Sequence, residues 1–167
     1  MKNMKTGFNL WTIALFTLLI GASCSDDDHP ANISDAVKDT FMNDYPHVGR
    51  VEWSVKAGYF VADFYEDGVE KDVWYSKNGQ WCMTETDLGR SLNLLPADVQ
   101  TAFQNSGYDS WSVDDIDKYE CPDKTFYLLE IEAKGKRDRK LFYSDGGQLL
   151  KDVEDKENDD VLPTITF

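Results

Sequence analysis

The sequence predicts an α+β protein built from two copies of one unit, each a helix followed by about four antiparallel strands. Three pairs of similar segments predict the repeat, because they recur in the same order along the chain. The matches are residues 33–41 with 95–103, 59–64 with 126–131 and 72–81 with 140–149, at offsets of 62, 67 and 68. The growing offset indicates longer loops in the second copy.

Each copy begins with a predicted helix. In the first copy, Ile33, Val37 and Phe41 follow one another at four-residue spacing, which places them on one helix face. Ser34 is a suitable N-cap, and Tyr45-Pro46 ends the helix because a residue before proline avoids the helical conformation.

The second helix repeats this pattern. Leu95, Val99 and Phe103 are the equivalent apolar positions, and Pro96 suits the first helical turn. Gly107 is expected to supply the C-terminal cap, because glycine adopts positive φ at little cost.

Strands follow each helix. In residues 59–65, Phe60, Ala62 and Phe64 alternate with a second set of side chains that point to the opposite face, and residues 50–55 alternate similarly. One helix cannot cover the apolar surface of such a half. The halves are therefore predicted to join into one antiparallel sheet of roughly eight strands with both helices on one face.

Turn residues separate the strands. Glu66-Asp67-Gly68 predicts a turn into a strand that ends near Ser76. Asn78-Gly79 predicts a two-residue hairpin turn, because both central residues of such a turn take positive φ. Residues 145–147, Asp-Gly-Gly, take the same place in the second copy.

The N-terminal residues predict export. Lys2 and Lys5 precede an apolar run at residues 10–20, shorter than the roughly 20 residues that span a bilayer. Small residues and Cys24 follow, which resembles the lipobox of bacterial lipoproteins. We expect residues 1–23 to be a lipoprotein signal peptide and Cys24 to be lipidated, with membrane contact through the lipid anchor only. A buried helix or a membrane anchor is the alternative.

Residues 24–32 are predicted to be an acidic tether. Asp26–Asp28 repel one another and stay solvated. A serine and acidic residues directly after Cys24 also resemble the export signal that sends some lipoproteins to the outer face of the outer membrane. The expected location is the cell envelope, as an outer-membrane lipoprotein that is either displayed on the surface or periplasmic.

The charge of the chain excludes some partners. The 167 residues contain 17 Lys and Arg against 31 Asp and Glu, a formal charge of −14, which opposes binding to nucleic acid or to an anionic membrane surface. Much of this acidity lies in the tether and in a C-terminal tail, residues 153–167. The tail ends apolar, and it either adds an edge strand or is a disordered terminus.

The ordered motifs resemble the PepSY-like family, which is described as similar in fold to the β-lactamase inhibitor protein. The matching residues are Phe41, Tyr45-Pro46, Val51-Glu52-Trp53, Phe64, Val73-Trp74-Tyr75, Asn78-Gly79, Leu95-Pro96, Phe103, Tyr108, Phe142-Tyr143 and Asp145-Gly146. The resemblance implies an envelope-anchored or secreted binding module without catalytic residues, with repeats at 33–90 and 91–152.

The residues themselves also argue against catalysis. Only two histidines are present, and no HExxH, G-x-S-x-G or CxxC motif occurs, so we expect no enzyme activity and no cofactor. Asp114, Asp115 and Asp117 suggest a cation-binding loop, but the EF-hand pattern is missing. We interpret them as a solvated loop before a strand at Ile116 and predict no metal site. Cys82 and Cys121 either form a disulfide or stay free.

Aromatic residues on the strands are the best binding candidates. The predicted binding face contains Trp53, Tyr59, Tyr65, Trp74 and Phe126. Outward aromatic side chains bind peptides, protein loops or sugars by stacking, although packing across strands is the alternative. We therefore expect a non-enzymatic lipoprotein that binds a protein or peptide and in one form regulates or inhibits an envelope hydrolase. The alternatives are small-ligand or glycan binding, and a structural envelope role.

Overall fold

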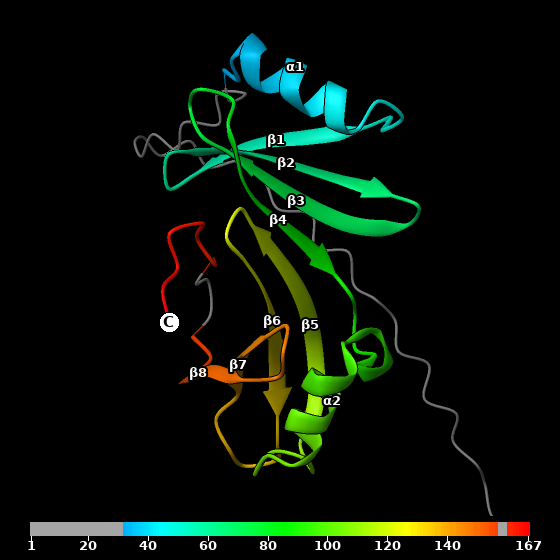
Figure 1. The fold of residues 1–167 in the computed structure, drawn as a ribbon, viewed down its shortest axis with the longest axis vertical. Helices are drawn as coiled ribbons and strands as arrows, with labels where there is room; N and C mark the ends of the chain where they lie inside the picture. Colours follow the sequence, from blue (N-terminus) through cyan, green and yellow to red (C-terminus); the bar gives the residue numbers. More distant parts are fainter. Residues whose placement is uncertain (1–31, 157–159) are drawn as a thin grey trace, which may run out of the picture.

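The computed structural model describes residues 32–156 and 160–167, and these form one antiparallel sheet with helices against it (Figure 1). The predictions for the signal peptide, for Cys24 and for most of the tether fall outside the described residues. The helices are α1 Asp35–Asp44, the short 3-10 helix η1 Leu92–Leu94 and α2 Ala97–Gln104. The strands are β1 Val51–Lys56, β2 Tyr59–Glu66, β3 Val69–Tyr75, β4 Trp81–Asp87, β5 Ser112–Cys121, β6 Lys124–Glu132, β7 Arg139–Ser144 and β8 Leu149–Glu154.

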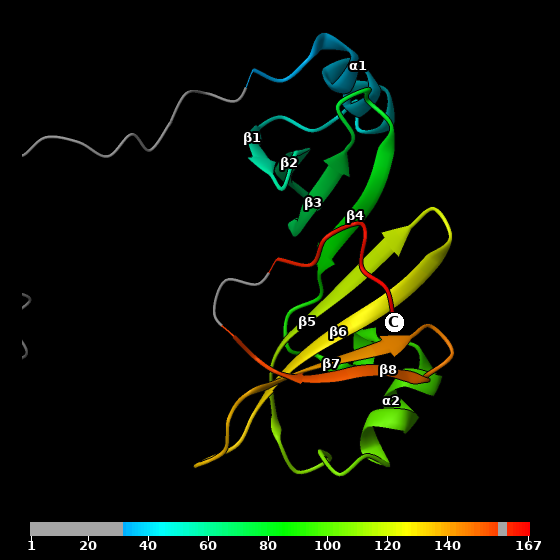
Figure 2. The ribbon, with the colours of Figure 1, turned by 90° about the vertical axis from the view of Figure 1, so that its left-hand side faces the viewer.

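The eight strands lie in the sheet in the order in which they follow along the chain. Each of α1 and α2 precedes four strands, and the two helices lie toward opposite ends of the sheet (Figures 1 and 2). β4 and β5 join the two halves, with Thr84 opposite Glu120 and Asp87 opposite Asp117. The α+β class and the single antiparallel sheet are confirmed.

Both helices pack on the same face of the sheet. Val73 packs under α1, and its cross-strand partner Thr84 pairs in turn with Glu120 of β5. Ile116 lies on the same side of β5 as Glu120, because the two are four residues apart, and it packs under α2 with Val99. The sequence prediction of helices on one face therefore agrees with the strand register.

The helix ends agree with the sequence except at two residues, Gly107 and Pro96, and Pro96 is the N-cap of α2 and not part of its first turn. α1 begins after Ser34 and ends at Asp44 before Tyr45-Pro46, and α2 begins after Pro96. The predicted cap at Gly107 is wrong, because the helix ends earlier, at Gln104. The Asn105 backbone N–H bonds to the Thr101 carbonyl, and its side-chain amide donates to the same oxygen at 2.8 Å, so no glycine is required.

The hairpin at Asn78-Gly79 exists, but the predicted two-residue turn is wrong. Of the two residues only Gly79 has positive φ, at +79°. Its N–H bonds to the Ser76 carbonyl, and the Ser76 N–H bonds to the Gln80 carbonyl at 2.9 Å, which closes a three-residue loop. A two-residue turn with both φ positive occurs instead at Asp67-Gly68, with φ of 54° and 82°.

The sheet face away from the helices, here called the distal face, carries an apolar cluster of its own, separate from the clusters under α1 and α2. Its buried members are Val61, Trp74, Met83, Tyr119, Cys121, Phe126, Leu128, Phe142 and Val161. Val161 belongs to the C-terminal segment, residues 160–167, which packs over this cluster (Figure 2). The Phe167 ring lies 5.1 Å from Phe126 and 5.6 Å from Phe142.

Both predictions for the apolar end of the tail, an edge strand or a disordered terminus, are therefore wrong, because residues 160–167 pack on the distal face without adding a strand. Burial of their apolar side chains against the exposed apolar sheet supplies the reason. Cys82 and Cys121 are both free thiols. Among the described residues, no helix has the length and apolar character needed to cross a membrane.

Candidate functional site

Four of the five candidate aromatic residues lie on the distal face, and Trp53 does not. Trp53 pairs with Ala62, which packs under α1, and the Trp53 ring lies 5.4 Å from that of Phe41. Placing Trp53 with the other four was therefore wrong. The register with β2 turns it toward the helix, as alternation requires once Ala62 faces α1.

The four distal aromatics differ in exposure. Trp74 and Phe126 are 1% and 0% exposed, whereas Tyr65 is 62% exposed. Tyr59 packs edge-on against Trp74, with ring centroids 6.1 Å apart. Packing across strands thus accounts for Trp74 and Phe126, and Tyr65 is the freely accessible member of the set.

Beside the apolar cluster, the distal face forms an acidic cleft of about 310 Å³ at the junction of the two halves. Eight carboxylates and three lysines line it, together with Tyr119, Leu128 and Val161. The charged residues are Glu70, Asp72, Glu85, Asp87, Asp115, Asp117, Glu130, Asp160, Lys56, Lys71 and Lys140. The cleft therefore attracts cationic groups.

Ion pairs fix the walls of the cleft. Lys56 Nζ lies 3.3 Å from Asp72 and 3.6 Å from Asp160, which ties the C-terminal segment to β1 and β3. On the other side, Lys140 Nζ lies 3.0 Å from Glu130 and 3.1 Å from Asp155. Lys56 and Lys140 thus neutralise carboxylates at the walls of the cleft, whereas no lysine pairs with the carboxylates of its floor, Glu85, Asp87, Asp115 and Asp117, among the described residues.

The floor contains two carboxyl groups with raised pKa, the half-buried Glu85 and the buried Asp117. Burial raises the pKa of Glu85 to about 7, although the Tyr119 hydroxyl donates to its Oε1 at 2.9 Å and opposes the shift. Burial, followed by the charges of Glu85 and Asp115, raises the pKa of Asp117 to about 8. Carboxyl groups perturbed in this way inside a cleft are typical of functional sites.

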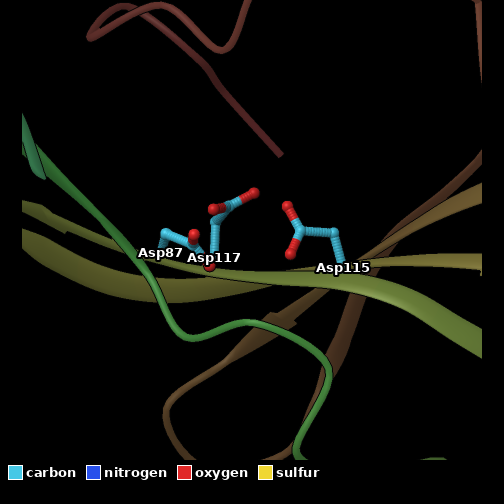
Figure 3. Close-up of side chains that lie close together, drawn as sticks. All are labelled: Asp87, Asp115 and Asp117. Atoms are coloured by element: carbon cyan, nitrogen blue, oxygen red, sulfur yellow. The ribbon is translucent and has the colours of Figure 1, made fainter. Parts of the chain in front are cut away.

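Three aspartates stand together on this floor (Figure 3). Asp87, Asp115 and Asp117, the aspartate triad, each offer one carboxylate oxygen, and these oxygens lie within 4.8 Å of one another. Asp87 and Asp117 are cross-strand partners, and Asp115 projects from the same side of β5 as Asp117. Asp114 lies apart and pairs with Arg90 at 2.7 Å.

A strand at Ile116 is confirmed, but the interpretation of the aspartates before it as a solvated loop is wrong, because β5 already begins at Ser112. The spacing Asp115-x-Asp117 is itself a signal that the two share one face of a strand, as is Glu85-x-Asp87. The pairing of β4 with β5 brings Glu85-x-Asp87 next to Asp115-x-Asp117. No local sequence pattern predicts this pairing.

Comparison with known proteins agrees with this architecture. A family model described as "Putative beta-lactamase-inhibitor-like, PepSY-like" matches residues 58–151. The crystal structure of a BLIP-like protein from Bacteroides fragilis is 37% identical, covers 84% of this chain and 100% of its own, and has a TM-score of 0.73.

Two further crystal structures have the same fold. A DUF2874 family protein from Bacteroides ovatus is 35% identical, covers 72% of this chain and 86% of its own, and has a TM-score of 0.69. A "putative periplasmic" protein from Bacteroides eggerthii is 24% identical, covers 72% and 88%, and also has a TM-score of 0.69. No curated protein sequence matches the chain.

Proposed function

Because the chain belongs to the PepSY-like family, we propose that it is a non-enzymatic envelope protein that binds a protein or peptide partner on the distal face of its sheet. The inhibitor-like description of the family supports a protein partner, and regulation or inhibition of an envelope hydrolase is the specific form of the proposal. The observation that carries it is the acidic cleft, bordered by the exposed ring of Tyr65.

The accessible part of the distal face supports binding away from the C-terminal segment. A hollow of about 410 Å³ surrounds Tyr65 and is lined by Arg50, Glu52, Asp63, Phe64 and Glu70. Glu70 also lines the acidic cleft, so the two depressions are contiguous at this residue. An exposed aromatic ring among carboxylates is a suitable anchor for a basic segment of a partner.

The burial of Trp74 and Phe126 weakens the case for glycan binding. Sugars stack on accessible aromatic faces, and these two rings are covered by neighbouring side chains. Charge complementarity on the remaining surface favours a cationic protein segment instead.

A photo-crosslinking amino acid in place of Tyr65 is expected to form an adduct with one partner protein in intact cells. The same amino acid in place of Met42, which is 52% exposed on α1, is the matched control and should give no such adduct. Mass spectrometry of the crosslinked band identifies the partner.

Neutralising the surface should weaken the same contact. Asp63→Asn combined with Glu70→Gln is expected to lower the crosslinking yield by roughly threefold or more at low ionic strength, because two rim charges are lost. Identical adducts from positions 65 and 42, or none from position 65, contradict binding through the distal face.

We also propose that residues 1–23 are a cleaved signal peptide and that Cys24 anchors the protein at the outer membrane. The short apolar run and the small residues before Cys24 support this proposal. Radioactive palmitate is expected to label the wild-type protein and not the Cys24→Ala variant, which lacks the thiol that carries the lipid. Equal labelling of the two proteins is evidence against the anchor.

Finally, we propose that residues 33–90 and 91–152 are two copies of one ancestral unit. Each contains a helix followed by four strands, and the loops at Gly79 and Gly147 each approach the backbone of the helix in the same half. Residues 24–32 are then a tether, and the tail predicted from residue 153 begins after β8, which ends at Glu154.

A further inference from the structure

We propose that the aspartate triad, Asp87, Asp115 and Asp117, is a binding site for a divalent cation, with calcium preferred. The site goes beyond the binding of a protein partner and does not depend on it. Three carboxylate oxygens from two adjacent strands lie within 4.8 Å of one another on the cleft floor (Figure 3).

The distances suit a cation. Oxygens that lie within 4.8 Å of one another share a central point at most about 2.8 Å from each, close to the 2.3–2.6 Å of calcium–oxygen contacts. A slight rotation of the side chains closes the difference. Asp87 is exposed, so water can complete the six to eight oxygens that calcium takes.

The second observation is that Asp117 is buried without a partner. Its side chain is aimed into the triad and the residue is only 9% exposed, yet its carboxylate takes part in no hydrogen bond or ion pair among the described residues. A buried carboxylate without a partner is costly, and it is compensated either by a proton or by a coordinated metal ion.

The lysines of the cleft do not supply the missing charge. Lys56 pairs with Asp72 and Asp160, Lys140 with Glu130 and Asp155, and Lys71 with Glu66 at 2.6 Å. In the described part of the chain, no ion pair reaches the triad. A bound cation is therefore the charge that matches this floor.

The ligand set favours calcium over softer metals. All three donors are carboxylate oxygens, which hard cations prefer, and no histidine or cysteine belongs to the cluster. Calcium accepts irregular coordination, whereas magnesium demands a near-ideal octahedron and keeps its water. Three carboxylates spread over two strands fit the more permissive ion.

Calcium at about 10 mM is expected to raise the melting temperature of the purified protein above that in sodium chloride of equal ionic strength, since extracellular calcium sites bind at 10⁻⁴–10⁻³ M. Asp117→Asn and Asp115→Asn should bind roughly tenfold more weakly, because each removes a charged ligand. Asp63→Asn is the matched control. It removes one carboxylate from the distal face outside the triad and should keep the full calcium response.

Terbium luminescence gives a readout that does not depend on stability. Tyr119, hydrogen-bonded to Glu85, lies in the cleft, so excitation of tyrosine should sensitise a bound terbium ion, and calcium should displace it. Sensitised emission lost in Asp117→Asn and kept in Asp63→Asn supports the site. Equal responses in the two variants, or none in the wild-type protein, overturn it and leave the triad as a cluster that is neutralised by protons.

Discussion

Replacing Phe126 by alanine is expected to lower the free energy of unfolding by about 3–5 kcal/mol, the usual loss when a buried phenylalanine leaves a cavity. The Phe126 ring is fully buried and stacks on Tyr119 with a centroid distance of 4.9 Å. Phe167 covers it from the C-terminal segment. Deletion of the ring therefore removes contacts on both sides. Urea denaturation followed by tryptophan fluorescence measures the loss.

Tyr65→Ala is the control for this prediction. Tyr65 lies on the same face and is 62% exposed, so its removal should change the free energy of unfolding by no more than about 0.5 kcal/mol. Similar urea midpoints for Phe126→Ala and Tyr65→Ala refute the idea that the C-terminal segment and the sheet form one packed core. The two variants also separate a residue of the core from a residue of the proposed binding surface.

Local patterns in the sequence account for most of the fold. Four-residue spacing of Val37 and Phe41 predicts α1, because the packed face of a helix repeats with that period. Alternation in β2 predicts which side chains share a face, and it correctly sets Phe64 apart from Val61. Both patterns can be read from residues close together in the sequence, so they predict the helix and the strand without knowledge of distant contacts.

The candidate site depends on contacts that no local pattern reveals. Asp87 and Asp117 meet only because β4 pairs with β5 across a connection that contains η1 and α2. The burial of Trp74 and Phe126 follows in part from side chains distant in sequence, such as Phe167 against Phe126. The pairing of β4 with β5 therefore brings the aspartates of the cleft floor together, and packing between distant residues, including those of the C-terminal segment, buries aromatic side chains that the sequence predicts to be exposed.

Gly147→Ala is expected to destabilise the protein by about 3 kcal/mol. Gly147 has φ of +78°, a conformation that costs an L-residue about 1–2 kcal/mol. A Cβ atom there would lie 2.5 Å from the Asp98 carbonyl oxygen and 2.7 Å from its carbon, so the loop must move away from α2 at an overpacking cost of about 1–3 kcal/mol. Urea midpoints at an unchanged slope measure the effect.

Gly135→Ala separates the two causes. Gly135 has φ of +73°, and a Cβ atom there would meet no atom within 4 Å, so only the conformational cost of about 1–2 kcal/mol applies. Gly79→Ala should fall between the two variants, because its Cβ would meet the Ala36 carbonyl oxygen at 3.1 Å. Equal losses in Gly147→Ala and Gly135→Ala would mean that the loop gives way freely. The close contact of each hairpin loop with the helix of its own half would then contribute nothing to the stability of that half.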